Sequence, residues 1–193
     1  MIREIFNRIN DDHRVGFAAL EENLDTIEKV AGLIVERIKK GKKVLVAGNG
    51  GSAAQSQHFA AEIVGRYAKE RKGYPSIALT TDTSIITAIG NDYGFENIFR
   101  RQIEAIGENE DIFIGISTSG NSTNIIEAIK EAKKLGLTVI TLTGRDGGKM
   151  RNISDYNINI PLKDTPRIQE IHDTILHMIA EITERILTPG EQA

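Results

Sequence analysis

Hydrophobic positions follow a helical period through the first 40 residues. The apolar residues recur every three or four positions: Ile2, Ile5, Phe6, Ile9, Leu20, Leu24, Ile27, Val30, Ala31, Ile34 and Ile38. The polar cluster at 10–12 and Gly16 interrupt this pattern, and Lys39, Lys40 and Gly41 are typical of a helix end. The pattern therefore predicts two helices, with a break between residues 10 and 16.

Five short apolar runs, rich in β-branched residues, follow this helical segment. They cover residues 44–47, 76–80, 111–117, 138–144 and 156–161. Most are apolar at successive positions, which is typical of strands buried on both faces. Helical patterns alternate with these runs at residues 53–66, 84–106 (interrupted near 90–94), 124–135 and 167–187.

Alternation of strands and helices predicts βαβ units with right-handed crossovers and a mainly parallel sheet. We expect an α/β fold: a doubly wound, five-stranded parallel sheet of flavodoxin-like order with an N-terminal helical extension. A single domain spans 1–193, with N-terminal helices at 1–42 and the sandwich core and C-terminal helix at 43–188. Ligands of such sheets bind at the carboxyl ends of the strands, so the loops there are the candidate site.

Composition narrows the class of function. The chain of 193 residues is 40% hydrophobic, which suits one domain with a proper core. Its net charge of -3 argues against a general nucleic-acid binder. No apolar run reaches membrane-span length and the N-terminus lacks a signal-peptide pattern. With no cysteine, the chain fits a reducing compartment. We expect a cytoplasmic protein with a small-molecule partner, no nucleic acid and no membrane.

Two polar loops follow predicted strands and precede predicted helices. Residues 48–53 are rich in glycine, and residues 117–123 contain three serines and two threonines. Glycine lets backbone N–H groups approach an anion, and a helix N-terminus adds partial positive charge. The lysine of a nucleotide-binding P-loop is absent, and Gly48, Gly50 and Ala53 fit only the loose dinucleotide pattern. Such residues also serve as ordinary caps and turns, but the two loops together favour a compact monophosphate.

Two helices carry groups suited to metal binding or acid–base chemistry. His58, Glu62 and Arg66 fall at i, i+4 and i+8, on one helix face. An imidazole and a carboxylate at this spacing can bind one metal ion. The alternative is a solvated face with a Glu62–Arg66 ion pair, which stabilises a helix by only tenths of a kcal/mol.

The C-terminal helix contains Gln169, His172 and His177 in the segment RIQEIHDTILH. His172 fits a surface or helix-pairing position. His177 lies among apolar residues, where a buried polar group needs a partner, and Asp173 is a candidate partner. Gln169 and His177 are about 12 Å apart along a straight helix and differ by about 80° around it. Both reach one metal only if long side chains converge, the helix bends, or subunits share the site.

Five segments in order resemble the phosphoheptose isomerase family, a branch of the sugar isomerase (SIS) fold. They are GNGGSAAQSQHFAAEIVGRY, AIGNDYGF, GISTSGNS, VITLTGRDGGKM and RIQEIHDTILH. The resemblance covers residues 44–187, with a similar helical extension before them. Each segment is modest alone, but five at the right separations are specific.

The resemblance implies the residues of an active site. It implies that Glu62 and His177 are the catalytic acid–base pair. It assigns the metal, usually one zinc ion per subunit, to His58, Glu62, Gln169 and His177. It assigns substrate binding to Asn49, Gly50, Gly51, Ser52, Glu62, Arg66, Asn91, Asp92, Ser117, Thr118, Ser119, Ser122 and Gln169. Some relatives have an aspartate where this chain has Thr165, which we expect to be a polar substitute there.

The resemblance also implies an activity and an assembly. The reaction is conversion of sedoheptulose 7-phosphate to D-glycero-D-manno-heptose 7-phosphate through an enediol. The product feeds nucleotide-activated heptose biosynthesis for surface polysaccharide, of which lipopolysaccharide is the expected example. The family is typically a homotetramer, and we expect active sites at subunit interfaces.

Three other functions of the same fold compete with this one. A sugar-phosphate-sensing domain is the least favoured, because we find no DNA-binding segment in the sequence. Replication-initiation regulators, which bind the initiator protein, share GNG-SAA, QHFAA and RIQE. They lack the carboxylate at position 62 and the imidazole at position 177, and they carry an arginine where this chain has Ser119. The enzyme interpretation is therefore favoured. An SIS isomerase acting on another sugar phosphate, of five or six carbons, remains open.

Overall fold

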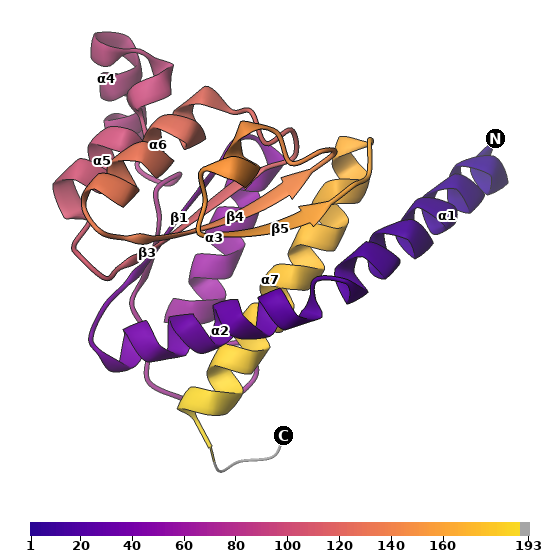
Figure 1. Ribbon diagram of the computed structural model, residues 1–193, viewed down its shortest axis with the longest axis horizontal. Helices are drawn as coiled ribbons and strands as arrows, with labels where there is room; N and C mark the ends of the chain where they lie inside the picture. The colour runs from indigo at the N-terminus through magenta and orange to yellow at the C-terminus, as the bar shows by residue number, and fades with distance from the viewer. Residues whose placement is uncertain (190–193) are drawn as a thin grey trace.

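Five parallel strands form the centre of the fold (Figure 1). The computed structural model describes residues 1–189. The strands are β1 (Val44–Gly48), β2 (Ser76–Ala78), β3 (Ile112–Ser117), β4 (Thr138–Gly144) and β5 (Tyr156–Ile160). Their order is β2-β1-β3-β4-β5, and each neighbouring pair is parallel. The predicted flavodoxin-like order is confirmed.

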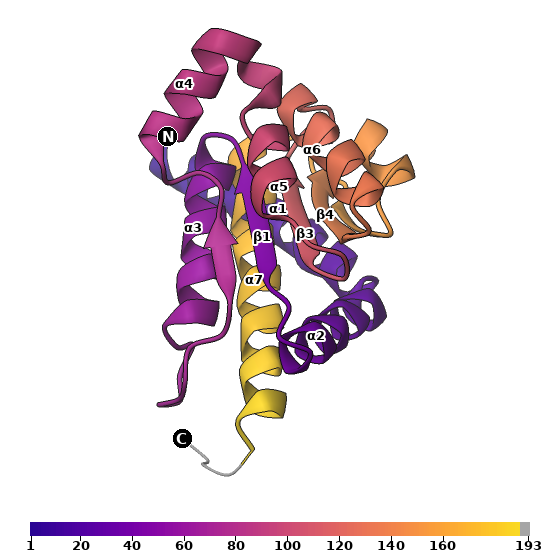
Figure 2. The ribbon, with the colours of Figure 1, turned by 90° about the vertical axis from the view of Figure 1, so that its left-hand side faces the viewer.

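Helices cover both faces of this sheet, so the fold is doubly wound as predicted. α2, α3 and α7 pack on one face, and α5 and α6 on the other. Figure 2 shows α3 and α7 side by side. The helices are α1 (Ile2–Glu21), α2 (Leu24–Lys39), α3 (Gly51–Val64), α4 (Thr83–Tyr93), η1 (Phe95–Asn97), α5 (Arg100–Ile106), α6 (Thr123–Lys134), η2 (Lys149–Asn152) and α7 (Thr165–Leu187).

The burial of the strands explains why apolar runs in the sequence predict them. Every residue of β1 and β3 is buried, because both strands have a neighbour on each side and helices on both faces. Gly48 pairs with Ile116, and Ser117 pairs with Thr143. The carboxyl ends of β1, β3 and β4 are therefore adjacent, and the loops after them converge. β2, at the edge, ends at Ala78 and is shorter than predicted.

The predicted break between residues 10 and 16 is wrong. α1 is continuous, and the chain turns only at Glu22 and Asn23. Gly16 is buried inside α1, and a Cβ at this position would lie 2.8 Å from Cγ1 of Ile171 on α7. Glycine at this position allows α1 and α7 to pack closely. In sequence, a glycine that packs against another helix cannot be told from a glycine that ends a helix.

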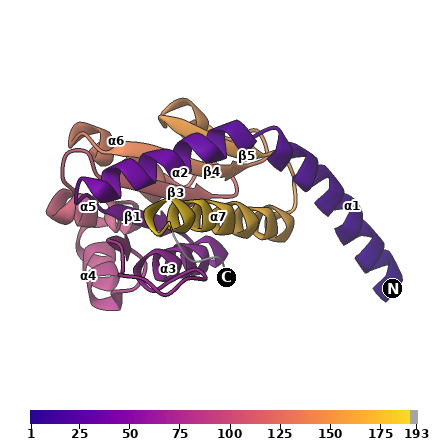
Figure 3. The same ribbon diagram turned by 90° about the horizontal axis from the view of Figure 1, so that it is seen from below.

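Two helices extend away from the sheet. α1 projects well beyond the strands (Figure 3), and Ile2 and Phe6 near its start are 75% and 65% exposed. α4 has no buried residue. Within residues 1–189, no helix combines the length and apolar character that a membrane span requires.

Candidate active site

A cavity of about 290 Å³ lies where the loops after β1 and β3 meet the start of α7. The cavity brings together most of the residues predicted to bind substrate, from segments far apart in sequence. Its lining residues are Asn49, Gly50, Gly51, Ser52, Ile116, Ser117, Thr118, Ser119, Ser122, Thr165 and Gln169. We call it the serine-loop cavity.

Residues 117–123, which we call the serine loop, contribute hydroxyl groups to the lining of this cavity. Ser117 Oγ lies 2.8 Å from Ser122 Oγ and 3.4 Å from Ser119 Oγ. Ser122 is the N-cap of α6, yet its side chain makes no capping hydrogen bond. The hydroxyls therefore gather at the N-terminus of α6, an arrangement suited to a phosphate.

Residues 48–53, which we call the glycine loop, form another part of the lining of the serine-loop cavity. Gly50 has φ +55°, in the left-handed region, and a Cβ at Gly51 would lie 2.4 Å from the side-chain nitrogen of Gln169. The start of α3 can thus receive the Gln169 carboxamide only because position 51 lacks a side chain. Gln55 fixes the same part of α7 by donating a 2.7 Å hydrogen bond to the Gln169 carbonyl.

Asn124 joins the two loops, and sequence reasoning missed it. The side-chain amides of Asn49 and Asn124 exchange two hydrogen bonds, of 2.9 and 2.8 Å. Asn124 is 2% exposed. A polar residue this early in an amphipathic helix is the only signal in sequence, because its partner lies 75 positions away.

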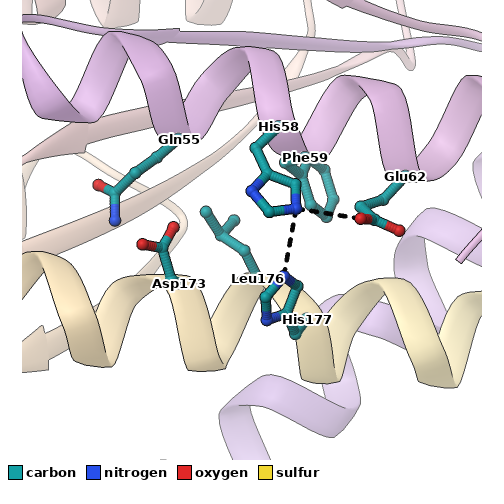
Figure 4. A pocket seen from close by; sticks show the side chains of 7 residues that line it. All are labelled: Gln55, His58, Phe59, Glu62, Asp173, Leu176 and His177. Carbon is teal, nitrogen blue, oxygen red and sulfur yellow. Dashed lines mark hydrogen bonds and ion pairs between the residues drawn. The ribbon is translucent and has the colours of Figure 1, made fainter.

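A second pocket, which we call the imidazole pocket, lies further along α3 and α7 (Figure 4). Its lining residues are Gln55, His58, Phe59, Glu62, Asp173, Leu176 and His177. His58 and Glu62 come from α3, and His177 comes from α7. His58 Nε2 lies 3.0 Å from Glu62 Oε1 and 3.3 Å from His177 Nε2. The structure therefore brings three of the predicted groups together within one chain, their ligand atoms all within 4.8 Å of one another.

The donor set of this pocket fits a zinc ion. Neutral imidazole and ionised carboxylate each offer a lone pair, and His58 Nε2 alone faces two such atoms. Two nitrogens about 2.0–2.1 Å from one tetrahedral zinc are roughly 3.4 Å apart, close to the observed 3.3 Å between His58 and His177. His58 is 51% exposed and Glu62 20%, so an ion has access.

Among the described residues, the structure shows neither the Glu62–Arg66 ion pair nor a hydrogen bond between Asp173 and His177. Glu62 contacts His58, while Arg66 is exposed and donates to the Ala68 carbonyl at 3.4 Å. Asp173 lines the same pocket as His177, but the hydrogen bond of the His177 ring is to His58.

Several predicted site residues lie outside this pocket. The Gln169 carboxamide borders the serine-loop cavity and is not among the residues that line the imidazole pocket. Asn91 and Asp92 lie exposed on α4, where Asn91 donates a 2.8 Å hydrogen bond to Asp92. Neither lines the two cavities, and Arg66 lines neither. Their roles remain predictions from the resemblance.

His172 is fully buried, so the surface position considered for it is wrong. Its Nε2 lies 3.1 Å from the Thr143 carbonyl at the end of β4. Burial lowers the pKa of His172 to about 4, although the hydrogen bond to Thr143 opposes this shift. The imidazole is therefore neutral near pH 7 and faces the sheet.

Comparison with known proteins agrees with this geometry. The SIS domain family matches residues 12–144. The phosphoheptose isomerase of Aliarcobacter butzleri is 55% identical over 88% of this chain and 89% of its own. That of Geobacter sulfurreducens is 51% identical over 98% and 100%.

Solved structures give the same result. The phosphoheptose isomerase from Neisseria gonorrhoeae superposes with a TM-score of 0.89 at 40% identity, covering 95% of this chain and 99% of that one. The enzyme from Francisella tularensis also gives 0.89, at 34% identity, over 96% and 98%. The chain belongs to the phosphoheptose isomerase family of SIS-domain proteins.

Proposed function

We propose that the protein is an aldose–ketose isomerase that converts sedoheptulose 7-phosphate to D-glycero-D-manno-heptose 7-phosphate, for nucleotide-activated heptose biosynthesis. One observation carries the proposal. A cavity of about 290 Å³ lined by hydroxyls and a pocket holding a carboxylate and two imidazoles lie along the same pair of helices. One end of a sugar phosphate would be held while the other reacts.

The separation of the two pockets suits a six- or seven-carbon substrate better than a five-carbon one. Gly51 to His58 spans about 10 Å of helix, and Gln169 to His177 about 12 Å, at 1.5 Å per residue. An extended chain gains about 1.2 Å per bond. Eight bonds from the terminal carbon of a heptose to its phosphorus therefore cover roughly 10 Å. A pentose phosphate, with six bonds, covers only about 7 Å.

The serine loop would hold the phosphate. Ser117, Ser119 and Ser122 offer hydroxyls, and the N-terminus of α6 adds partial positive charge. Binding energy from this remote group would position the reacting carbons over the second pocket. Thr165 and Gln169 line the same cavity and would contact the middle of the sugar.

Glu62 and His177 are proposed as the acid–base pair. Glu62 would take the proton from one of the carbons C1 and C2 and return it to the other. His177 would donate and accept the proton of the neighbouring oxygen, which gives an enediol between substrate and product. Well-placed groups of this kind contribute about 10²–10⁴-fold in rate.

One zinc ion per subunit is proposed at His58, Glu62 and His177. A bound cation lowers the basicity of a carboxylate and occupies the lone pair of an imidazole nitrogen. Glu62 and His177 would therefore have to leave the metal before they move a proton. When bound, it would polarise the substrate carbonyl and stabilise negative charge on the sugar oxygens. The resemblance adds Gln169 as a ligand. Its carboxamide lies against Gly51, so this role requires a different side-chain direction.

We also propose a cytoplasmic homotetramer with active sites at subunit interfaces. The exposed apolar start of α1 and the unburied α4 support contact with further copies. Asn91 and Asp92 lie outside both cavities in one chain, and a neighbouring copy would bring them to a site.

The test is incubation with sedoheptulose 7-phosphate, with and without added zinc, followed by product analysis. Six- and five-carbon phosphates serve as competing substrates, and Glu62→Gln as the inactive control. We expect the heptose product from the wild type only. Absence of isomerisation at any metal loading, with binding to a replication initiator, would overturn the proposal in favour of the regulator.

A further inference from the structure

The segment that follows α3 is attached to α7 by one buried carboxylate. Glu184 is 2% exposed. Its Oε2 accepts hydrogen bonds from the backbone N–H groups of Ala68 and Lys69, at 2.8 and 2.9 Å. Its Oε1 accepts from the N–H of Tyr67 at 2.9 Å. Three successive backbone donors therefore converge on one side chain from a helix more than a hundred residues later.

Arg71 completes this arrangement and connects it to α3. Its Nε donates to Glu184 Oε1 at 2.8 Å, and its side chain is 3% exposed. Its Nη2 donates to the Glu62 carbonyl at 2.8 Å, and its Nη1 to the Ile63 carbonyl at 3.0 Å. The last carbonyls of a helix have no partner within it, so Arg71 caps α3 at the residue that carries the proposed base.

Tyr67 carries the connection to the other catalytic group. Its ring centroid lies 6.0 Å from that of His177, and its backbone N–H is one of the three donors to Glu184. Burial, followed by the nearby carboxylates of Glu181 and Glu62, raises the pKa of the Tyr67 phenol. The ring beside His177 is therefore a neutral contact.

We propose that Glu184 and Arg71 are positioning residues for the acid–base site. Arg71 fixes the backbone of Glu62, and Glu184, through Tyr67, fixes the ring of His177. The inference rests on the proposed function. Neither residue lines the serine-loop cavity or the imidazole pocket, so both act through other groups.

The expected signature is a loss in kcat and in metal affinity with little change in KM. Displacing a catalytic group by about 1 Å can cost about a hundredfold in rate. Partners that orient metal ligands typically change metal affinity or activity by about 10–100-fold. The phosphate would be held elsewhere, at the serine loop, so we expect KM to stay within about threefold of the wild type.

The experiment compares Glu184→Gln and Arg71→Lys with a matched control, Asp111→Asn. Asp111 is also fully buried, accepts from the backbone N–H groups of Lys43 and Glu108, and pairs with Lys43 Nζ at 2.7 Å. It lies at the amino end of β3, away from the site. Urea unfolding, kcat, KM and zinc affinity by chelator competition are measured for each. All three should lose stability, but only the first two should lose kcat and zinc affinity.

The outcomes separate this inference from the proposed function. If both variants keep kcat and zinc affinity within about twofold, or if Asp111→Asn loses as much, the positioning role is wrong. If either fails to fold, Tyr67→Leu, which removes the ring beside His177, must lower kcat for the inference to stand. If the wild type binds zinc without isomerising, the proposed function is refuted. The zinc affinities of the two variants then decide whether the positioning role is correct. If the wild type isomerises without binding zinc, the kcat values of the two variants decide whether the positioning role is correct.

Discussion

Acidification from pH 7 to pH 5 should destabilise the fold through one imidazole, that of His172. The side chain is fully buried between α7 and β4, and its Nδ1 has no hydrogen-bond partner among the described residues. A proton added there would place a charge in the buried interior facing the backbone of Thr143, with no carboxylate among its hydrogen-bond partners.

The pKa of His172 sets the size and direction of the effect. It falls from 6.5 to about 4 because burial disfavours the charged form. Below pH 6.5 the unfolded chain binds a proton that the folded chain does not bind until about pH 4. Stability is therefore complete above pH 6.5 and decreases as the pH falls. Linkage gives a loss of roughly 2 kcal/mol by pH 5 and roughly 3 kcal/mol by pH 4.

Urea unfolding at pH 7, 6 and 5, at one protein concentration, measures this loss in the wild type and in His172→Gln. Glutamine does not titrate, so the variant should lose about 2 kcal/mol less than the wild type between pH 7 and 5. His13→Gln is the control, because His13 is 35% exposed and its removal should not reduce the loss. Equal pH dependence of the wild type and His172→Gln would refute the reasoning.

Three further outcomes follow from the site. Glu62→Gln or His177→Gln should lower kcat by about 10²-fold or more while far-UV circular dichroism stays unchanged; near-normal turnover would remove that residue from the mechanism. Dialysis against a chelator should abolish turnover and zinc should restore it, whereas full activity of a sample free of metal by elemental analysis would reject the metal. Gly51→Ala should raise KM, because a Cβ there would lie 2.4 Å from the side-chain nitrogen of Gln169; unchanged steady-state kinetics would show that the carboxamide can move freely.

The sheet was predictable because local pattern and environment agree along most of it. β3 and β4 lie within one residue of their predicted ranges, since strands with helices on both faces are largely apolar and β-branched. β2 is at the edge, where Ile77 is 42% exposed, and its pairing ends earlier than its apolar run. The continuity of α1 was not predictable, because the partner of Gly16 is Ile171 on a distant helix.

The site was predictable only in its local parts. Glycine and serine loops after strands, and His58 with Glu62 on one helix face, are visible from spacing alone. The meeting of His58 with His177 depends on how α3 and α7 pack, and the residues are 119 positions apart. The partners of Asn124 and Glu184 lie 75 and 117 positions away, so the sequence around these residues does not show what they bind.

Two faces of α7 make different contacts, and the period of the helix places His172 on one face and His177 on the other. His172 and His177 are five residues apart, which places them about 140° apart around the helix. The first faces β4 and is fully buried, whereas the second faces α3 and the imidazole pocket. A rotation of α7 large enough to move His177 from His58 would also break the contact between His172 and Thr143. The contact of the buried His172 with β4 therefore helps to set the rotation of α7 that turns His177 toward α3.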